Sequence, residues 1–122
     1  MPFTHLHVHT EYSLLEGSNK IKEYVAQVKK LGMTAAAITD HGVMYGCIDF
    51  YKEATAAGIN PILGCEVYVA PKSRFDRGEG GKNEERYYHL VLLAETNEGY
   101  ANLVKIVSAG FVDGFYYKPR VD

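Results

Sequence analysis

Apolar side chains repeat at helical spacing in three stretches of the chain, and each repeat predicts an amphipathic helix. The helices are expected near residues 18–32, 45–57 and 97–107. Ser18 and Asn97 suit the N-cap positions, whereas Gly32 and Gly58 suit the position after a last turn. The faces expected to be buried consist of Ile21, Tyr24, Val25, Val28 and Leu31 in the first helix, and of Tyr100, Leu103, Val104 and Val107 in the third.

Four short runs between these helices predict strands, at residues 3–9, 34–39, 59–69 and 87–94. Side chains alternate along a strand, so His5, His7 and His9 would share one face of the first run. Strands that alternate with helices are typical of a parallel sheet. We therefore predict an α/β fold with about four strands and three helices.

Two segments lack such a pattern. Residues 71–85 form a polar, glycine-rich stretch, and residues 111–122 carry aromatic side chains without a periodic arrangement. Four parallel strands with bare edges, and aromatic residues with nothing left to pack on, indicate that residues 1–122 are the N-terminal part of a larger domain. Basic side chains in and after the polar stretch alternate with acidic ones, which favours a solvated loop over a phosphate-binding one. These basic residues are Lys72, Arg74, Arg77, Lys82 and Arg86, and the acidic ones are Asp76, Glu79, Glu84 and Glu85.

Composition narrows the class of protein. Hydrophobic residues make up 47% of the chain, which is typical of a globular core. The formal net charge of −2 gives no overall basic character. We expect no contact with a membrane, because no apolar run approaches the roughly 20 residues of a span, and no signal peptide. Cys47 and Cys65 are expected to be buried thiols, so the chain is predicted to be cytoplasmic.

Side chains that can bind metals recur on successive strands. His7 and His9 lie two residues apart, and Asp40 and His41 follow the second predicted strand. Glu66 stands in an apolar strand, where a carboxylate is unfavourable unless it is paired or bound to a cation. Two further candidates are His89, in the fourth strand, and Glu16, in the loop after the first.

These residues supply nitrogen and oxygen donors but no convincing thiolate. Such a set argues against a structural zinc site and suits Zn, Mn or Fe in a catalytic one. Divalent ions of this kind activate water and clamp a phosphate, so the predicted reaction is phosphoester hydrolysis.

The motifs resemble the PHP (polymerase and histidinol phosphatase) family. The resemblance rests on His7-x-His9, on the Thr-Asp-His-Gly sequence at 39–42, on Gly-Cys-Glu at 64–66 and on His89. Residues 5–17, 38–42, 57–66 and 89–94 are most similar to the PHP domains of bacterial replicative DNA polymerases. Together these stretches span nearly the whole chain.

The resemblance implies the N-terminal portion of a distorted (β/α)7 barrel with about three metals at the strand ends. It implies that His7, His9 and Glu66 bind one metal, that Glu66 bridges to a second bound by His89, and that Glu16 and His41 bind a third. Members often carry Asp where this chain has Glu16. Asp40 would position its neighbours rather than bind metal. Later motifs of the family, including a final Asp-x-His, would lie beyond Asp122. No catalytic residue is assigned.

The same resemblance implies a function in DNA replication. The whole protein would be a DNA-directed DNA polymerase, a nucleotidyltransferase that contacts primer–template DNA and other replicase subunits. Its polymerase part, with Mg, would lie outside this chain. The PHP site would act as a metal-dependent 3′–5′ exonuclease, and the fragment alone is expected to be inactive. Two alternatives are a stand-alone phosphatase, such as one acting on histidinol phosphate, and a structural module without catalysis.

Overall fold

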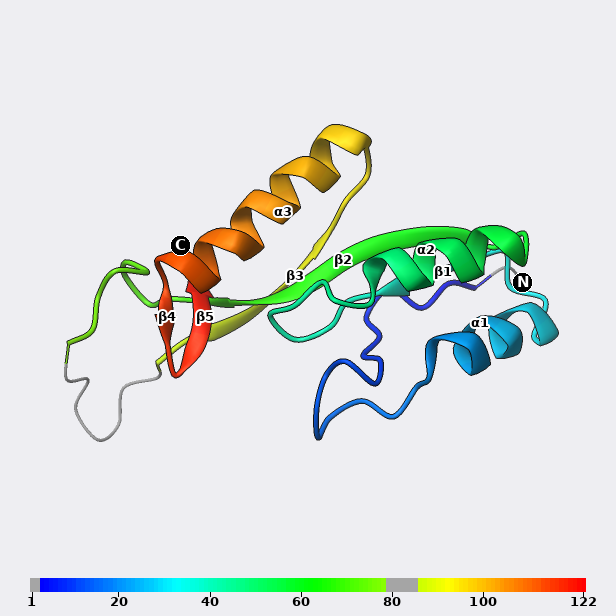
Figure 1. Cartoon of the computed structure of the whole chain (residues 1–122), viewed down its shortest axis with the longest axis horizontal. Coiled ribbons are helices and arrows are strands. Elements are labelled where there is room, and N and C mark those ends of the chain that lie inside the picture. Colours follow the sequence, from blue (N-terminus) through cyan, green and yellow to red (C-terminus); the bar gives the residue numbers. More distant parts are fainter. Residues whose placement is uncertain (1–2, 79–85) are drawn as a thin grey trace.

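The computed structural model describes residues 3–78 and 86–122, and these form three helices and five strands (Figure 1). The helices are α1 (Ile21–Lys30), α2 (Cys47–Ala56) and α3 (Asn97–Val112). The strands are β1 (Ala35–Ile38), β2 (Asn60–Val69), β3 (Tyr88–Leu93), β4 (Phe115–Tyr116) and β5 (Lys118–Val121). The predicted α/β class is confirmed.

Strand β2 is the central strand of the sheet and pairs with β1, β3 and β5. It pairs in parallel with β1 along its first half and with β5 at its last two residues, and β4 adds to β5. Strand β3 runs antiparallel to β2, so the expectation of an all-parallel sheet is wrong. A parallel connection requires a crossover, usually a helix, and no helix follows β2 in the described residues before β3.

The N-terminal segment also differs from its prediction. Residues 3–9 form no strand, and the chain bends at His7. The Val8 carbonyl accepts a hydrogen bond from the Thr39 amide, and the Val8 amide donates to Thr39 Oγ1 at 2.8 Å. A threonine side chain thus takes the place of the second ladder bond that a strand pair would need.

The helix boundaries depart slightly from the expected ones. Helix α1 follows Lys20, not Ser18, and has no side-chain cap, whereas Thr96 caps α3 by accepting from the Gly99 amide at 3.0 Å. Leu31 is 60% exposed rather than buried, because it lies beyond the last turn of α1. Gly32 and Gly58 both have positive φ, as expected after a helix end.

The segment at residues 111–122, which has no periodic pattern, completes α3 and forms β4 and β5. The two strands make a tight hairpin in which Tyr116 pairs with Lys118. Part of the polar stretch is anchored to this segment: Arg74 forms an ion pair with Asp122 at 2.7 Å. Glu79, Lys82, Glu84 and Glu85 lie outside the described residues.

Buried apolar side chains form two clusters. The first core is built by α1, β1, α2 and the start of β2, and consists of Ile21, Val25, Val28, Ala36, Ile38, Cys47, Phe50, Ala54 and Ile59. The second core lies between β2, β5 and α3, and consists of Cys65, Val67, Leu103 and Val121. Both cysteines are free and buried, as predicted, and burial raises the pKa of each thiol to about 12. Among the described helices, none combines the length and the apolar character needed to cross a bilayer.

Candidate metal centre

Glu66 is the residue on which the predicted donors converge. It lies within β2, and only 8% of its side chain is exposed. Its Oε2 atom lies 2.5 Å from His7 Nε2 and 2.6 Å from His9 Nε2. The two histidines are separated by Val8 alone, and although this segment forms no strand, both rings reach the same carboxylate and their centres lie 5.2 Å apart. His5 does not reach the carboxylate in this arrangement.

His41 reaches the same carboxylate through backbone pairing. The Gly42 amide donates to the Glu66 carbonyl, and the Glu66 amide donates to the Asp40 carbonyl, so the contact with β2 continues past the end of β1. His41 Nε2 lies 3.2 Å from Glu66 Oε2, and Nδ1 lies 3.1 Å from Glu16 Oε2.

His89 arrives from a strand of opposite direction. It pairs with Tyr68 at the start of β3, and its Nδ1 atom lies 3.3 Å from Glu66 Oε1. If β3 were parallel, its first residue would lie at the far end of the sheet. The antiparallel pairing therefore corrects the expected direction but explains how a residue at a strand start reaches the end of β2.

The donors form three overlapping groups in which the ligand atoms all lie within 4.8 Å of one another. The groups are His7, His9 and Glu66; His9, Glu16 and His41; and His41, Glu66 and His89. The structure thus brings together all six side chains proposed as metal ligands. The donors are imidazole nitrogens and carboxylate oxygens, which fit divalent metal ions. Nearby Cys65 is directed elsewhere, with Sγ donating to the Asp40 carbonyl.

Asp40 is 1% exposed and belongs to none of these groups. Its Oδ1 accepts from the Thr10 amide at 2.6 Å and from Ser13 Oγ at 2.7 Å, and its Oδ2 accepts from Thr10 Oγ1 at 2.8 Å. The carboxylate therefore holds the loop that connects His9 to Glu16.

The charges of the central pair favour a cation. Burial raises the pKa of Glu66, but hydrogen bonds from His7 and His9 and the charge of His41 outweigh this effect, so the pKa is lowered. Burial also lowers the pKa of His41, even though Glu66 opposes the shift. Near neutral pH the carboxylate is therefore charged and the imidazole of His41 is neutral, which are the states that bind metal.

Tyr68 is a member of the centre that was missed in the sequence. Its hydroxyl lies 3.1 Å from His41 Nδ1, and its ring packs edge-on against His41 and His89. Burial raises the pKa of Tyr68 to about 12, so the phenol is protonated at neutral pH. The two-residue spacing from Glu66 along β2 placed both on one face, and this spacing could have identified Tyr68.

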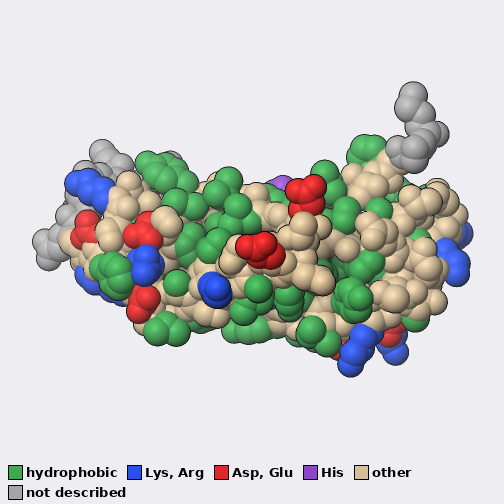
Figure 2. Space-filling model, turned by 90° about the horizontal axis from the view of Figure 1, so that it is seen from above, with side chains coloured by type: hydrophobic (Ala, Val, Ile, Leu, Met, Phe, Trp, Pro, Cys, Tyr) green, Lys and Arg blue, Asp and Glu red, His purple; other side chains and the backbone are tan. Residues whose placement is uncertain are grey.

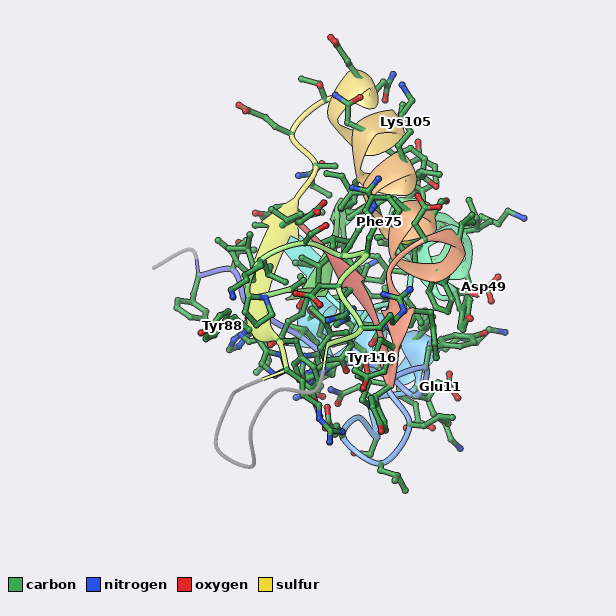
Figure 3. All side chains as sticks on the ribbon, turned by 90° about the vertical axis from the view of Figure 1, so that its left-hand side faces the viewer. Glu11, Asp49, Phe75, Tyr88, Lys105 and Tyr116 are labelled. Atoms are coloured by element: carbon green, nitrogen blue, oxygen red, sulfur yellow. The ribbon has the colours of Figure 1, made fainter. Side chains whose placement is uncertain are left out.

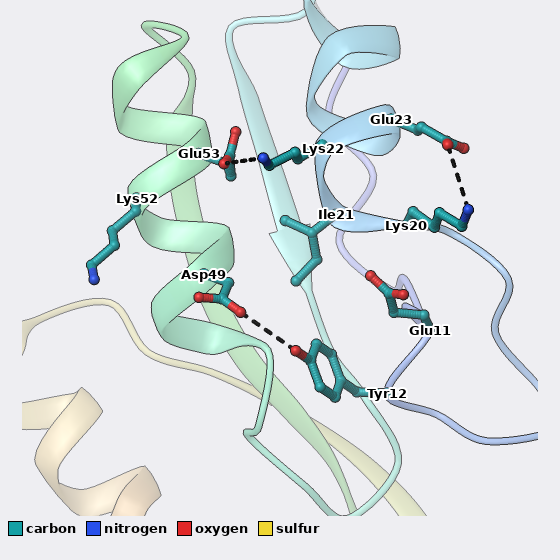
Figure 4. Close-up of a pocket in the computed structure, with 9 residues that line it drawn as sticks. All are labelled: Glu11, Tyr12, Lys20, Ile21, Lys22, Glu23, Asp49, Lys52 and Glu53. Atoms are coloured by element: carbon teal, nitrogen blue, oxygen red, sulfur yellow. Dashed lines mark hydrogen bonds and ion pairs between the residues drawn. The ribbon is translucent and has the colours of Figure 1, made fainter.

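A cavity of about 530 Å³ between α1 and α2 contains none of these donors (Figure 4). Its charged groups already face one another: Lys22 lies 3.9 Å from Glu53, and the Tyr12 hydroxyl lies 3.4 Å from Asp49. The lysine side chain is 83% exposed. The cavity is thus a solvated groove between two helices and is separate from the metal centre.

The fold agrees with the comparisons with known proteins. The PHP domain family matches residues 5–122, and the chain belongs to this family. The chain is 52% identical to DNA polymerase III subunit alpha of Treponema pallidum and 48% identical to that of Thermus aquaticus. Each alignment covers 100% of this chain and 10% of the relative, so the chain spans about one tenth of their length.

Two solved structures share the fold. An amidohydrolase from Chromobacterium violaceum, with bound sulfate and no metal, superposes with a TM-score of 0.56 at 22% identity, over 87% of this chain and 34% of that one. A protein of Bifidobacterium adolescentis assigned as a metal-dependent phosphoesterase has a TM-score of 0.56 at 19% identity, over 88% and 34%. Both confirm the PHP-type fold expected from the motifs.

Proposed function

We propose that the His/Glu centre is part of a metal-dependent phosphoesterase site in a replicative DNA polymerase of the polymerase III alpha type. The main support for this proposal is the convergence of six donor side chains, including the buried carboxylate of Glu66 itself. Similarity to polymerase alpha subunits over the whole chain supports the parent protein. The assignment of one structural neighbour as a metal-dependent phosphoesterase supports the chemistry.

The residues have distinct roles in this proposal. His7, His9 and Glu66 would hold one ion, Glu66 and His89 a second, and Glu16 and His41 a third. Bound Zn, Mn or Fe would activate a water molecule and neutralise the charge of a phosphate. Asp40 keeps the loop of Glu16 in place through three hydrogen bonds.

The role of the whole protein is also a proposal. Residues 1–122 would be the N-terminal part of the PHP domain of a cytoplasmic nucleotidyltransferase that replicates DNA. Polymerisation with Mg, and contacts with primer–template DNA and other replicase subunits, would depend on parts outside this chain. The PHP site would then remove nucleotides from the 3′ end of a primer, as a proofreading exonuclease.

The test uses the full-length protein, stripped of metal by a chelator and reloaded with Mn²⁺ or Zn²⁺. Without deoxynucleoside triphosphates, the loaded protein should release nucleotides from the 3′ end of a labelled primer. His9→Ala and Glu66→Gln should reduce this release to background, whereas Asp49→Asn, an exposed change in the groove between α1 and α2, should not. Primer extension with Mg²⁺ should persist in all three variants, which shows that they fold.

Two outcomes would replace the proposal. If the loaded protein releases no nucleotide and His9→Ala lowers only its stability, the centre is a structural module. If it cleaves small phosphomonoesters such as histidinol phosphate but no DNA, it is a phosphatase.

A further inference from the structure

Cationic side chains lie over aromatic rings at the edge of the metal centre. Lys118 Nζ is 5.5 Å from the centre of the Tyr68 ring, and the Arg86 guanidinium is 4.2 Å from the centre of the Tyr117 ring. Because Tyr68 also packs on His41 and His89, a single ring separates the ammonium of Lys118 from two imidazoles of the centre.

The β4–β5 hairpin carries Tyr117 and Lys118, and Arg86, which precedes β3, lies against the Tyr117 ring; these three residues are the rim of the centre. Residue Pro119 follows Lys118 and packs close to Gly42, where an added Cβ would lie 3.0 Å from the proline ring and 2.8 Å from the Tyr68 ring. The hairpin is therefore seated directly against the backbone that carries His41. Through Tyr68, Lys118 is thus linked to His41 and His89 of the centre.

Tyr117, at the turn of this hairpin, has an unfavourable backbone. Its φ of +62° lies in the left-handed region, where an aromatic side chain is unusual and strained. The residue is 62% exposed and its ring packs edge-on against Tyr116, so burial among the described residues offsets little of the strain. Strained residues of this kind cluster at active sites and ligand clamps.

Two neighbouring arginines, Arg77 and Arg120, are engaged in hydrogen bonds to the backbone. Arg77 and Arg120 lie near the Tyr116 ring, but both donate to backbone carbonyls: Arg77 to Asp113 at 2.6 Å and Arg120 to Asp76 at 2.6 Å. These two side chains hold the hairpin against the preceding loop. Lys118, by contrast, forms no ion pair with another described residue and is exposed.

We propose that Tyr117, Arg86 and Lys118 bind a single strand of nucleic acid and lead its end to the metal centre. Lys118 contacts the phosphate next to the centre, and Tyr117 stacks on an unpaired base with Arg86 beside it. Proteins that bind single strands combine these two elements, aromatic platforms for bases and cations for the backbone. This inference rests on the proposed function, because it names the substrate and its recognition at the same site.

Two substrates separate recognition of the strand from the chemistry in the full-length, Mn²⁺-loaded protein. An oligothymidylate requires both the rim and the centre, whereas bis(p-nitrophenyl) phosphate requires only the centre. Tyr117→Gly, which also relieves the backbone strain, should raise KM for the oligonucleotide about tenfold. This is the loss of affinity expected when one stacked base loses its aromatic partner. Its kcat/KM for the small phosphodiester should be unchanged.

Matched variants sharpen the result. Tyr117→Phe keeps the ring and should behave as the unchanged protein. Lys118→Ala should raise KM and reduce the slope of log affinity against log salt by about 0.7, the value for one phosphate of a single strand. Lys105→Ala, an exposed change in the middle of α3 and away from Tyr116 in Figure 3, should change neither KM nor the salt slope.

A crosslinking experiment with bromodeoxyuridine oligonucleotide in the presence of chelator tests binding without catalysis. Crosslinks should map to Tyr117 and weaken in Lys118→Ala. If neither substrate is cleaved but the crosslinks form, the proposed function fails and the strand-binding surface stands. If both substrates are cleaved equally by all variants and no crosslink maps to Tyr117, the surface is refuted. Loss of stability in Tyr117→Gly at constant KM would equally refute it, because the ring would then serve packing.

Discussion

The two halves of the molecule joined by β2 are packed to very different degrees. In the first half, α1 and α2 cover β1, and nine buried residues make up the first core. In the second half, α3 alone covers the end of β2 and β5, over the four buried residues of the second core. Helix α3 and the segment before α2 also line an apolar groove of about 370 Å³, and apolar side chains occupy much of the middle of this face (Figure 2).

The candidate metal centre lies between these halves and takes residues from both. His7, His9, Glu16 and His41 come from segments around the first core, whereas Glu66 and His89 come from the paired strands β2 and β3. The difference in packing indicates that the stability of the fold depends chiefly on the first core. The geometry of the donors depends on the segments around the centre. Damage to the first core should chiefly reduce the free energy of unfolding, and damage nearer the centre should chiefly reduce metal affinity.

The largest expected effect is on the first core. Phe50 is fully buried and stacks on Tyr24 with ring centres 6.0 Å apart. Phe50→Ala should reduce the free energy of unfolding by about 4 kcal/mol, whereas Leu103→Ala in the second core should reduce it by about 2 kcal/mol. Urea unfolding followed by circular dichroism measures both. Tyr51→Ala, an exposed change on the same helix as Phe50, is the control, and equal losses for the two core variants would refute the proposed imbalance.

The next effect separates donor geometry from stability. Asp40→Asn places an amide nitrogen against the donors of Thr10 and Ser13, and should destabilise the fold by about 2 kcal/mol. Because the loop to Glu16 then loosens, Zn²⁺ affinity should fall about 10- to 100-fold, as is usual when a group that orients ligands is lost. Competition with a chromogenic chelator measures it. Asp49→Asn should change neither quantity, and unaltered zinc affinity in Asp40→Asn would show that Asp40 serves the fold alone.

The pH dependence of stability, measured on metal-free protein, tests the protonation states of the candidate centre. The lowered pKa values of His41 and Glu66 mean that the unfolded chain takes up protons first as the pH falls. Stability contributed by His41 is present above its ordinary pKa of 6.5 and is lost below it, and that from Glu66 is lost below 4.5. The urea midpoint should therefore decrease in both windows. Glu66→Gln should remove the lower window only, and a midpoint that stays constant down to acid pH would contradict both shifts.

The sequence predicted local structure better than long-range pairing. Ile21, Val25 and Val28 repeat at helical spacing and are indeed buried, because this spacing follows from helix geometry alone. The direction of β3 could not be deduced from the sequence. It depends on the antiparallel pairing of β3 with β2, which is a contact between distant segments. Alternation in residues 3–9 predicted a strand, but there Thr39 provides a side-chain hydrogen bond in place of a ladder.

The centre was predictable for a related reason. Several donors are residue types that are unusual in their surroundings, such as Glu66 in an apolar strand, whereas Glu16, in an exposed loop, followed from the family resemblance. Tyr68 and Lys118 are ordinary residues for a strand and a surface turn, and only the pairing of β5 with β2 brings Lys118 to the rim. Rare chemistry in a sequence therefore identifies ligands, whereas the residues around them depend on contacts between distant segments.

The smallest expected effects concern one turn in each half. The change in the free energy of unfolding should have opposite signs in the two turns. Gly58 has a φ of +74° with open space around a Cβ, so Gly58→Ala should destabilise the chain by about 1 kcal/mol through the backbone alone. Gly32→Ala, with the same surroundings, is the matched repeat. Tyr117→Gly should instead stabilise by somewhat less than about 1 kcal/mol, because relief of strain is partly offset by the greater freedom of glycine in the unfolded chain. Thermal unfolding of the three variants decides the matter. A loss of stability in Tyr117→Gly would show that the tyrosine ring stabilises the fold, and the second half would then have no strained turn to distinguish it from the first.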